Sequence, residues 1–162
     1  MKQPQKWLAA ALIALGLKQA VWSDDVSDFR ENLQAAAQGL AQAQFNLGVM
    51  YENGQGVRQD DAEAVRWYRQ AAEQGDAESQ IHLGRMYVNG RGLRQDDAEA
   101  VKWFRQAAAQ GFSQAQYNLG IMYYKGHGVR QDLALAQEWL GKACQNGYQD
   151  SCDNYQRLKA GY

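Results

Sequence analysis

Apolar side chains recur at helical spacing through most of the chain. Ala43, Leu47, Met50 and Tyr51 stand at i, i+4, i+7 and i+8, which places them on one face of a helix. After a short glycine-containing segment a second helical stripe follows, made of Ala64, Val65, Trp67, Tyr68, Ala71 and Ala72. The pattern predicts two antiparallel helices, which we call helix A and helix B.

This two-helix pattern repeats every 36 residues from residue 39 onward, without insertion or deletion. Thirteen of the sixteen glycines occupy four positions of the repeat, and Trp67, Trp103 and Trp139 keep the same step. A period of this length is typical of solenoids, in which each unit buries its apolar face against its neighbours. We therefore expect an all-α fold, an α/α superhelical solenoid of antiparallel helix pairs.

The repeat divides the chain into complete units with shorter segments at both ends. Three A–B pairs are expected at 40–75, 76–111 and 112–147. Residues 24–39 match a helix B, and residues 148–162 match a degraded helix A. We expect these two segments to cap the stack, because terminal units of a solenoid have one face in water.

The ends of the predicted helices carry capping residues. Gly54 is placed to end the first helix A in a left-handed conformation, and Asp60 is an N-cap residue for helix B. Glu63, three residues later, predicts a capping box in which its side chain bonds the backbone N–H of Asp60. In the third unit Leu135 stands where the glutamate would be, so we expect the reciprocal bond to be lost there.

Glycine also stands in the middle of each helix A, at Gly48, Gly84 and Gly120. Glycine there costs about 1 kcal/mol relative to alanine, so we expect helices to cross at a separation that no side chain allows. The G-x-G loops lack the preceding strand and following lysine of a phosphate-binding loop. We therefore interpret them as turns.

The first 23 residues have the pattern of an export signal. Two lysines precede an apolar run over 7–17 that is shorter than the roughly 20 residues of a membrane-spanning helix. We predict a signal peptide over 1–23 with cleavage after Ser23; cleavage after Ala20 and an uncleaved anchor are the alternatives. The cleaved chain would be periplasmic or secreted, with no membrane association.

Composition narrows the class of protein. The chain has 162 residues, a formal net charge of −1 and a mean hydropathy of −0.63. These values exclude a multi-span membrane protein and do not favour a non-specific nucleic-acid surface. Residues 1–23 hold three lysines and no acid, so their removal changes the net charge from −1 to −4. We expect a monomer that binds no nucleic acid.

The consensus A-x-x-x-L-G-x-x-Y-x-x-G-x-G-V-x-x-D-x-x-x-A-x-x-W-x-x-x-A-A-x-x-G resembles the Sel-1-like repeat, a relative of the tetratricopeptide repeat. In the first unit its residues are Ala43, Leu47, Gly48, Tyr51, Gly54, Gly56, Val57, Asp60, Ala64, Trp67, Ala71, Ala72 and Gly75. The resemblance covers roughly residues 28–158; in the second unit Ser79 replaces the first alanine and Leu93 the valine. Members of this family are adaptors that hold partner proteins. The resemblance therefore implies a scaffold that binds peptides or proteins in envelope or host-interaction processes.

Two cysteines flank the last predicted turn. Cys144 lies near the end of a helix B and Cys152 early in the next helix A, so a bend at Gly147 lets them face each other within reach of a disulfide. Two buried thiols are the alternative. The C-x7-C spacing resembles that of the Helicobacter cysteine-rich secreted repeat proteins, in which each unit carries such a bridge. Together with a signal peptide, this resemblance favours an oxidised pair.

The motifs of common enzymes are missing. No serine begins S-x-x-K, and S-D-N and K-T-G do not occur, so serine β-lactamase machinery is absent. His82 and His127 stand at different positions of the repeat, and no metal-ligand spacing occurs. We expect no enzyme, no cofactor and no metal. An envelope protein that binds or hydrolyses β-lactam or peptidoglycan-like ligands is the alternative function, and a purely structural spacer is a third.

The face of helix A opposite its core stripe carries recurring amide and apolar side chains. The candidate peptide-binding residues there are Phe45, Asn46, Val49, Ile81, His82, Arg85, Tyr117, Asn118, Ile121 and Asn154. In such solenoids helix A lines the concave groove, where amides can bond a peptide backbone and apolar residues form shallow pockets. For Phe45, Ile81 and Tyr117 the alternative is that they pack one helix A on the next. The loop arginines at equivalent places are expected to form ion pairs with the helix caps; these are Arg58, Arg94 and Arg130.

Overall fold

The structure, a computed structural model, describes residues 24–161. The predicted signal peptide at 1–23 lies outside the described residues. Within 24–161 the chain is helical and has no strand, which confirms the all-α class. A helix at 24–37 is followed by α2 (Ala41–Asn53), α3 (Asp61–Glu73), α4 (Ala77–Asn89), α5 (Asp97–Ala109), α6 (Ser113–Lys125), α7 (Leu133–Gln145) and α8 (Gln149–Ala160).

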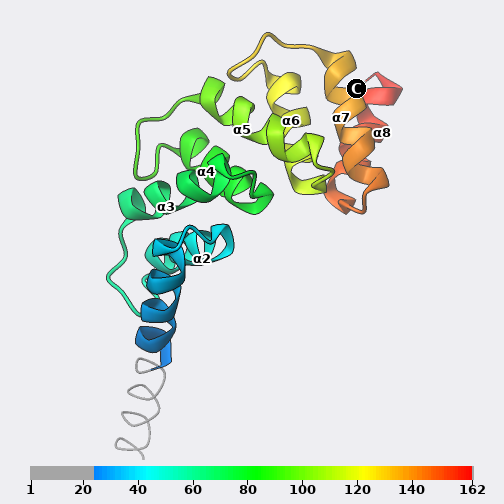
Figure 1. Ribbon diagram of the computed structural model, residues 1–162. Coiled ribbons are helices and arrows are strands. Elements are labelled where there is room, and N and C mark those ends of the chain that lie inside the picture. The colour runs from blue at the N-terminus through cyan, green and yellow to red at the C-terminus, as the bar shows by residue number, and fades with distance from the viewer. Residues whose placement is uncertain (1–23, 162) are drawn as a thin grey trace, which may run out of the picture.

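The helices pack in consecutive pairs along a curved path (Figure 1). The A helices α2, α4 and α6 pack on the B helices α3, α5 and α7, and each B helix also contacts the next A helix. Leu47, Leu83 and Leu119, at equivalent places of the A helices, are fully buried. The predicted α/α solenoid of helix pairs is confirmed.

The mid-helix glycines are close-packing sites, as predicted. A Cβ added to Gly48 would lie 2.5 Å from the ring of Tyr68, one added to Gly84 would lie 2.6 Å from Phe104, and one added to Gly120 would lie 2.8 Å from Leu140. Helix A therefore approaches its own helix B so closely that a bulky side chain from helix B fills the space of the missing Cβ. This contact outweighs the low helix propensity of glycine.

The second glycine of each loop joins neighbouring units. Gly92 has a φ of +68°, in the left-handed region that a tight bend requires. A Cβ there would also overlap the backbone carbonyl of Asp61, at the start of the preceding helix B, and Gly56 and Gly128 make the equivalent approach to Asp25 and Asp97. The expected turn is thus also a contact between successive units, which the local pattern does not reveal.

The N-caps are confirmed, but the reciprocal half of the capping box is wrong. The Asp60 side chain accepts from the backbone N–H groups of Ala62 at 2.9 Å and Glu63 at 3.1 Å. The Asp60 backbone N–H, however, donates to the carbonyl of Tyr51 at 2.9 Å, and the other two units repeat this bond. A carbonyl in the last turn of helix A has no donor within its own helix, so it takes the N–H that the glutamate would have bonded. Leu135 therefore loses no reciprocal bond.

A buried glutamine links successive units on the inside of the stack. In the first three A helices the amide Nε2 donates to a carbonyl near the end of the preceding B helix, eight residues earlier: Gln44 to Ala36 at 3.4 Å, Gln80 to Ala72 at 3.1 Å, and Gln116 to Ala108 at 3.2 Å. The glutamine oxygen also accepts a hydrogen bond from the residue that follows its own helix B; these donors are Gln74, Gln110 and Asn146. One side chain thus bonds two B helices.

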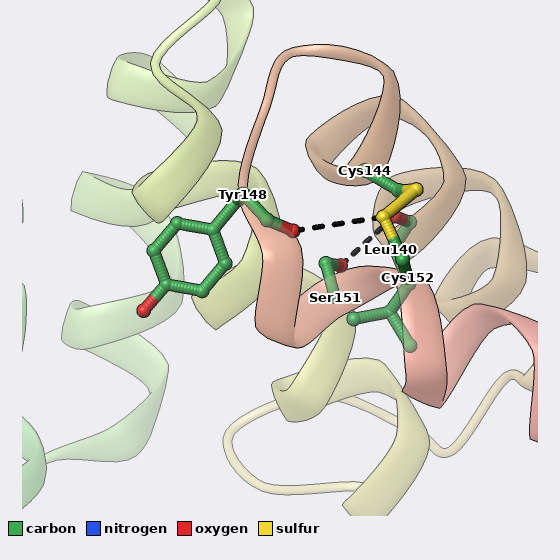
Figure 2. Close-up of a disulfide and its surroundings, with 5 residues drawn as sticks. All are labelled: Leu140, Cys144, Tyr148, Ser151 and Cys152. Atoms are coloured by element: carbon green, nitrogen blue, oxygen red, sulfur yellow. Dashed lines mark hydrogen bonds between the residues drawn. A yellow bond between two sulfur atoms is a disulfide. The ribbon is translucent and has the colours of Figure 1, made fainter.

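A disulfide takes the place of this link at the last junction. Cys144 and Cys152, one repeat beyond Ala108 and Gln116, are bonded with their Cα atoms 4.7 Å apart (Figure 2). Beside them the hydroxyl of Ser151, which is fully buried, donates to the carbonyl of Leu140 at 2.9 Å. The predicted disulfide is confirmed, and it fastens α8 to α7.

Candidate functional site

Three hollows lie at equivalent places of the stack. We call them the first, third and fourth hollows, because the asparagine of each belongs to the first, third or fourth A helix, which are α2, α6 and α8. The first hollow, of about 310 Å³, is lined by Asn32, Phe45, Asn46, Val49 and Met50. The third hollow, of about 320 Å³, is lined by Arg85, Val88, Phe104, Asn118 and Met122. The fourth hollow, of about 470 Å³, is lined by Ile121, Tyr124, Leu140, Asn154 and Leu158.

The hollows are equivalent because the same repeat positions build them. Each has an asparagine from helix A on its wall, which is Asn46, Asn118 or Asn154. Each has an apolar residue one helical turn later, which is Met50, Met122 or Leu158. Each is also lined by the same position of the preceding helix B, which is Asn32, Phe104 or Leu140. The solenoid therefore repeats one small concavity, whose chemistry changes with the side chains at a few places.

The three asparagines differ in how much of their hydrogen-bonding capacity the chain uses. Asn46 donates to the side-chain oxygen of Asn32 at 2.9 Å and accepts from Gln42 at 3.2 Å. Among residues 24–161, Asn118 and Asn154 form no side-chain hydrogen bond, and both are half-buried. Their amides are oriented by the helix and available to a ligand.

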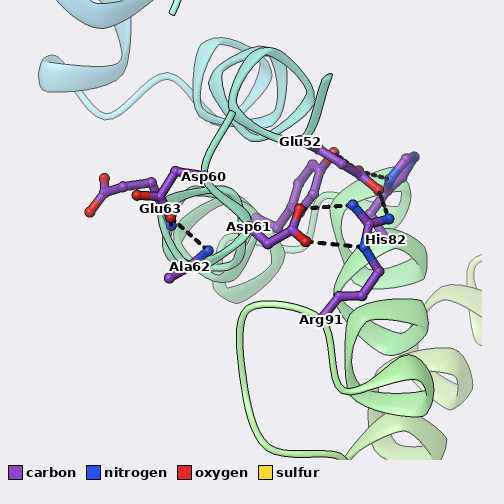
Figure 3. A network of polar contacts seen from close by, with 8 residues as sticks. Glu52, Asp60, Asp61, Ala62, Glu63, His82 and Arg91 are labelled. Carbon is purple, nitrogen blue, oxygen red and sulfur yellow. Dashed lines mark hydrogen bonds and ion pairs between the residues drawn. The ribbon is translucent and has the colours of Figure 1, made fainter. Parts of the chain in front are cut away.

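At the second repeat position the equivalent places carry Tyr68, His82 and Met86. Glu52, Asp61 and Arg91 lie together beside His82 (Figure 3). Glu52 accepts from the Tyr68 hydroxyl at 2.7 Å and from Arg91 at 2.9 Å, and its Oε2 lies 3.4 Å from Nδ1 of His82. Arg91 also donates to both carboxylate oxygens of Asp61, at 2.8 and 3.2 Å. We call Glu52, Asp61, Tyr68, His82 and Arg91 the polar cluster.

The protonation of the polar cluster follows from burial and from its hydrogen bonds. Burial raises the pKa of Glu52, but the bond from Tyr68 and the interactions with His82 and Arg91 outweigh this, so the pKa of Glu52 lies below its ordinary value. Burial lowers the pKa of His82, and the nearby Glu52 carboxylate opposes the shift only in part. Burial and the bond to Glu52 raise the pKa of the Tyr68 hydroxyl. At neutral pH the cluster therefore holds an ionised Glu52 beside a neutral imidazole.

The apolar candidates lie largely between successive A helices. The Phe45 ring centroid is 5.5 Å from that of His82 and 5.9 Å from that of Tyr68, so Phe45 packs across from α2 to α3 and α4. Ile81 is 4% exposed and belongs to the core, and the Tyr117 ring lies 4.9 Å from that of Tyr148. These positions show the helix-to-helix packing that was considered as their alternative role.

The remaining candidates face the hollows or solvent. Val49 is in the first hollow, Arg85 in the third and Ile121 in the fourth. His82 also borders a further hollow of about 500 Å³ that includes Phe112 and Tyr148. The expected loop-to-cap ion pairs are absent among the described residues, because Arg58, Arg94 and Arg130 are exposed and none lies near a described carboxylate.

Sequence reasoning missed the polar cluster. Glu52 and Arg91 are 39 residues apart, and Tyr68 belongs to the predicted core stripe of its helix, where it is fully buried. The available signal was the variable residue between the two loop glycines, which is Gln55, Arg91 or His127 in successive units. An arginine that occurs at this position in one unit of a regular repeat indicates an ion pair that is specific to that unit.

The described residues contain no candidate metal site and no candidate membrane-spanning helix. In residues 24–161 no group of three or more His, Cys, Asp or Glu side chains is arranged to hold a metal ion. No helix in the same range is both long and apolar enough to cross a membrane.

Comparison with known proteins identifies the repeat. Three consecutive segments of the chain, 41–76, 77–112 and 113–148, match the Sel1 repeat. A comparison with functionally curated proteins gave no match.

Solved structures share the fold. A protective antigen of uropathogenic Escherichia coli strains, which displays an SLR fold, is 46% identical with a TM-score of 0.75; the alignment covers 78% of this chain but 26% of that one. A Sel1 repeat protein from Oxalobacter formigenes is 31% identical with a TM-score of 0.77, over 90% of this chain and 59% of the other. Helicobacter pylori cysteine-rich protein B has a TM-score of 0.64 at 20% identity, over 79% of this chain and 95% of that one. The chain thus spans about a quarter of the first of these proteins and somewhat over half of the second.

Proposed function

Because this chain is a Sel1 repeat protein, we propose that it is an exported scaffold that binds an extended peptide or a segment of a partner protein along its A helices. The observation that carries the proposal is the recurrence of the first, third and fourth hollows, each with an asparagine on its wall. A row of equivalent concavities suits an extended ligand, because an extended chain presents its own groups at regular spacing.

The chemistry of the row matches a peptide. Asparagine offers both a donor and an acceptor, so Asn118 and Asn154 can bond the N–H and C=O groups of a ligand backbone whatever its sequence. The apolar lining, such as Ile121 and Met122, can receive side chains and supply affinity by burial. We place the ligand on the concave side of the stack, with Val49, Arg85 and Ile121 beside the asparagines.

Four of the candidate residues have a supporting role in this proposal. Phe45, Ile81 and Tyr117 hold successive A helices at a set spacing, and His82 belongs to the polar cluster that anchors α4 to α2. The spacing of the hollows depends on these contacts. Asn46, already bonded to Asn32 and Gln42, contributes less to binding than Asn118 and Asn154.

Export is supported by two independent features. Disulfides persist in oxidising compartments, and Cys144 is bonded to Cys152. The N-terminal sequence has the composition of a signal peptide. We therefore propose a periplasmic or secreted monomer that acts without nucleic acid, cofactor or catalysis. Cell fractionation locates the chain, and a nitrocefin assay on the same preparation detects any β-lactam hydrolysis.

A peptide-display selection tests the binding proposal. Dodecapeptides selected on the purified protein are expected to bind with affinities measurable by fluorescence anisotropy. Replacing Asn118 or Asn154 by alanine should weaken that binding about five- to tenfold, the loss expected for one or two hydrogen bonds. Arg94→Ala, at an exposed loop position outside the hollows, is the matched control and should change nothing. Failure to select any peptide, or binding indifferent to both asparagines, would contradict the proposal.

A further inference from the structure

The fourth hollow is the most positively charged of the three, because two cations line it whereas Arg85 alone lines the third. Its rim carries Lys125, the last residue of α6, and Arg157 from the last turns of α8, and no acidic residue lines it. Neither cation has an ion-pair partner among residues 24–161. The first hollow has the opposite character, because Asp25 and Asp28 line it. The row of hollows is therefore acidic at its N-terminal end and basic at its C-terminal end.

The floor of the fourth hollow is apolar and broad. Ile121, Tyr124, Leu140 and Leu158 form it, and Tyr124 remains 41% exposed. A neighbouring hollow of about 720 Å³ shares Tyr124 and Leu158 and adds Leu133, which is 51% exposed. Exposed leucine and tyrosine beside each other indicate a surface that a ligand can cover. The hollow thus combines an apolar floor with two cations that form no ion pair among residues 24–161.

We propose that the fourth hollow binds the C-terminal residue of a partner chain, with its carboxylate on Arg157 and Lys125 and an apolar side chain on the floor. This inference rests on the proposed peptide-binding function and adds the chemistry and direction of the ligand. A guanidinium donates two parallel hydrogen bonds to a carboxylate, and the ammonium of Lys125 adds a second charge.

A C-terminal residue fits the fourth hollow better than an internal acidic residue does. In a C-terminal residue the carboxylate and the apolar side chain leave the same Cα, so both fit one hollow of about 470 Å³. Within an extended segment neighbouring side chains point to opposite sides, so an acidic and an apolar side chain on one side are two residues apart. The partner then runs from the acidic first hollow toward the basic fourth hollow, with its negative terminus at the basic end.

Three matched peptides test the proposal on the purified protein by NMR titration and fluorescence anisotropy. The first is fluorescein-Gly-Ser-Gly-Ser-Phe-Leu with a free C-terminal carboxylate. The second is its C-terminal amide, and the third is the amide with aspartate in place of the serine before phenylalanine. We expect the free acid to bind at least tenfold more tightly than either amide and to shift the amide resonance of Leu158. Equal binding of the free acid and its amide would overturn the proposal, and so would equal binding of the internal aspartate peptide.

Variants separate this inference from the broader function. Arg157→Gln and Lys125→Gln should each weaken the free acid at least fivefold and leave the amide unchanged, whereas Arg130→Gln, in an exposed loop, should affect neither. Unchanged affinity of the free acid in Arg157→Gln would refute the terminal-carboxylate site. If display-selected peptides depend on Asn118 but ignore their C-terminal carboxylate, this inference fails and the peptide-binding function stands. If no peptide binds at all, both fail.

Discussion

The side-chain amide of Gln116 donates a 3.2 Å hydrogen bond to the carbonyl of Ala108, and one repeat later the same two places hold the Cys152–Cys144 disulfide. The covalent bond therefore substitutes for a polar link that the other junctions make with a glutamine. The substitution occurs at α8, whose main packing partner among the described helices is α7. The disulfide thus adds a covalent link to the contact that holds α8 in the stack.

The disulfide should therefore be replaceable in part by the glutamine link. Cys144→Ala/Cys152→Ala should lower the free energy of unfolding by about 2–3 kcal/mol, the value for closing so short a loop. Cys144→Ala/Cys152→Gln should recover about 1 kcal/mol of that loss, because it restores the amide-to-carbonyl bond. Urea unfolding followed by circular dichroism measures both. The substitution idea is wrong if the two double variants are equally stable.

Alanine at Gly84 should destabilise the protein although alanine is the better helix former. The added Cβ would lie 2.6 Å from the Phe104 ring, which is itself 2% exposed and cannot move away. We expect a loss of about 1–3 kcal/mol in thermal or urea unfolding, typical of overpacking. Gly141→Ala is the graded control: its Cβ would lie 3.1 Å from the half-buried Tyr155, so the loss should be smaller. A stabilised Gly84→Ala would show that helix propensity prevails over packing.

The contributions of Tyr68 and Glu52 to the free energy of unfolding should be non-additive. Tyr68→Phe removes the 2.7 Å bond to Glu52, so it should raise the pKa of that carboxyl and cost about 1–3 kcal/mol of stability. The next unit carries Phe104 and Val88 at these two places. Tyr68→Phe/Glu52→Val should therefore cost less than the sum of the two single substitutions. Additive losses in this double-mutant cycle, or an unchanged pKa of Glu52 by NMR, would contradict the coupling.

His82 should make stability depend on pH near neutrality. Burial holds its folded pKa below the ordinary value of 6.5, so the unfolded chain binds more protons. Stability is then full above about pH 7.5 and falls as the pH drops through the unfolded pKa toward the folded one. His82→Asn, which places the asparagine of the equivalent positions there, should flatten the urea midpoint between about pH 7.5 and 5.5. An equally steep decline in His82→Asn would assign the effect elsewhere.

Several features of the structure could be predicted from residues that lie close together in the sequence. The stripe at Ala43, Leu47 and Met50 predicted a helix face, and Asp60 predicted its own N-cap, because each depends on bonds within one or two turns. Cys144 and Cys152 were within reach because a single bend separates them. Even there, the Asp60 backbone N–H bonds the carbonyl of Tyr51 and not the side chain of Glu63. The Tyr51 carbonyl belongs to the preceding helix, and a local sequence pattern cannot indicate that it lies within hydrogen-bond distance.

The repeat, the helices and their aspartate caps, and hence the class of fold, could be predicted from the amino-acid pattern, because each of these depends on residues within one unit. The three-dimensional arrangement was needed to show that Arg91 bonds both Glu52 and Asp61, and that Asn118 and Asn154 line separate hollows. These contacts depend on the angle and distance between successive units. That geometry is set by many small packing contacts, such as Gly48 against Tyr68, whose combined effect on curvature has no signature at any one position of the sequence.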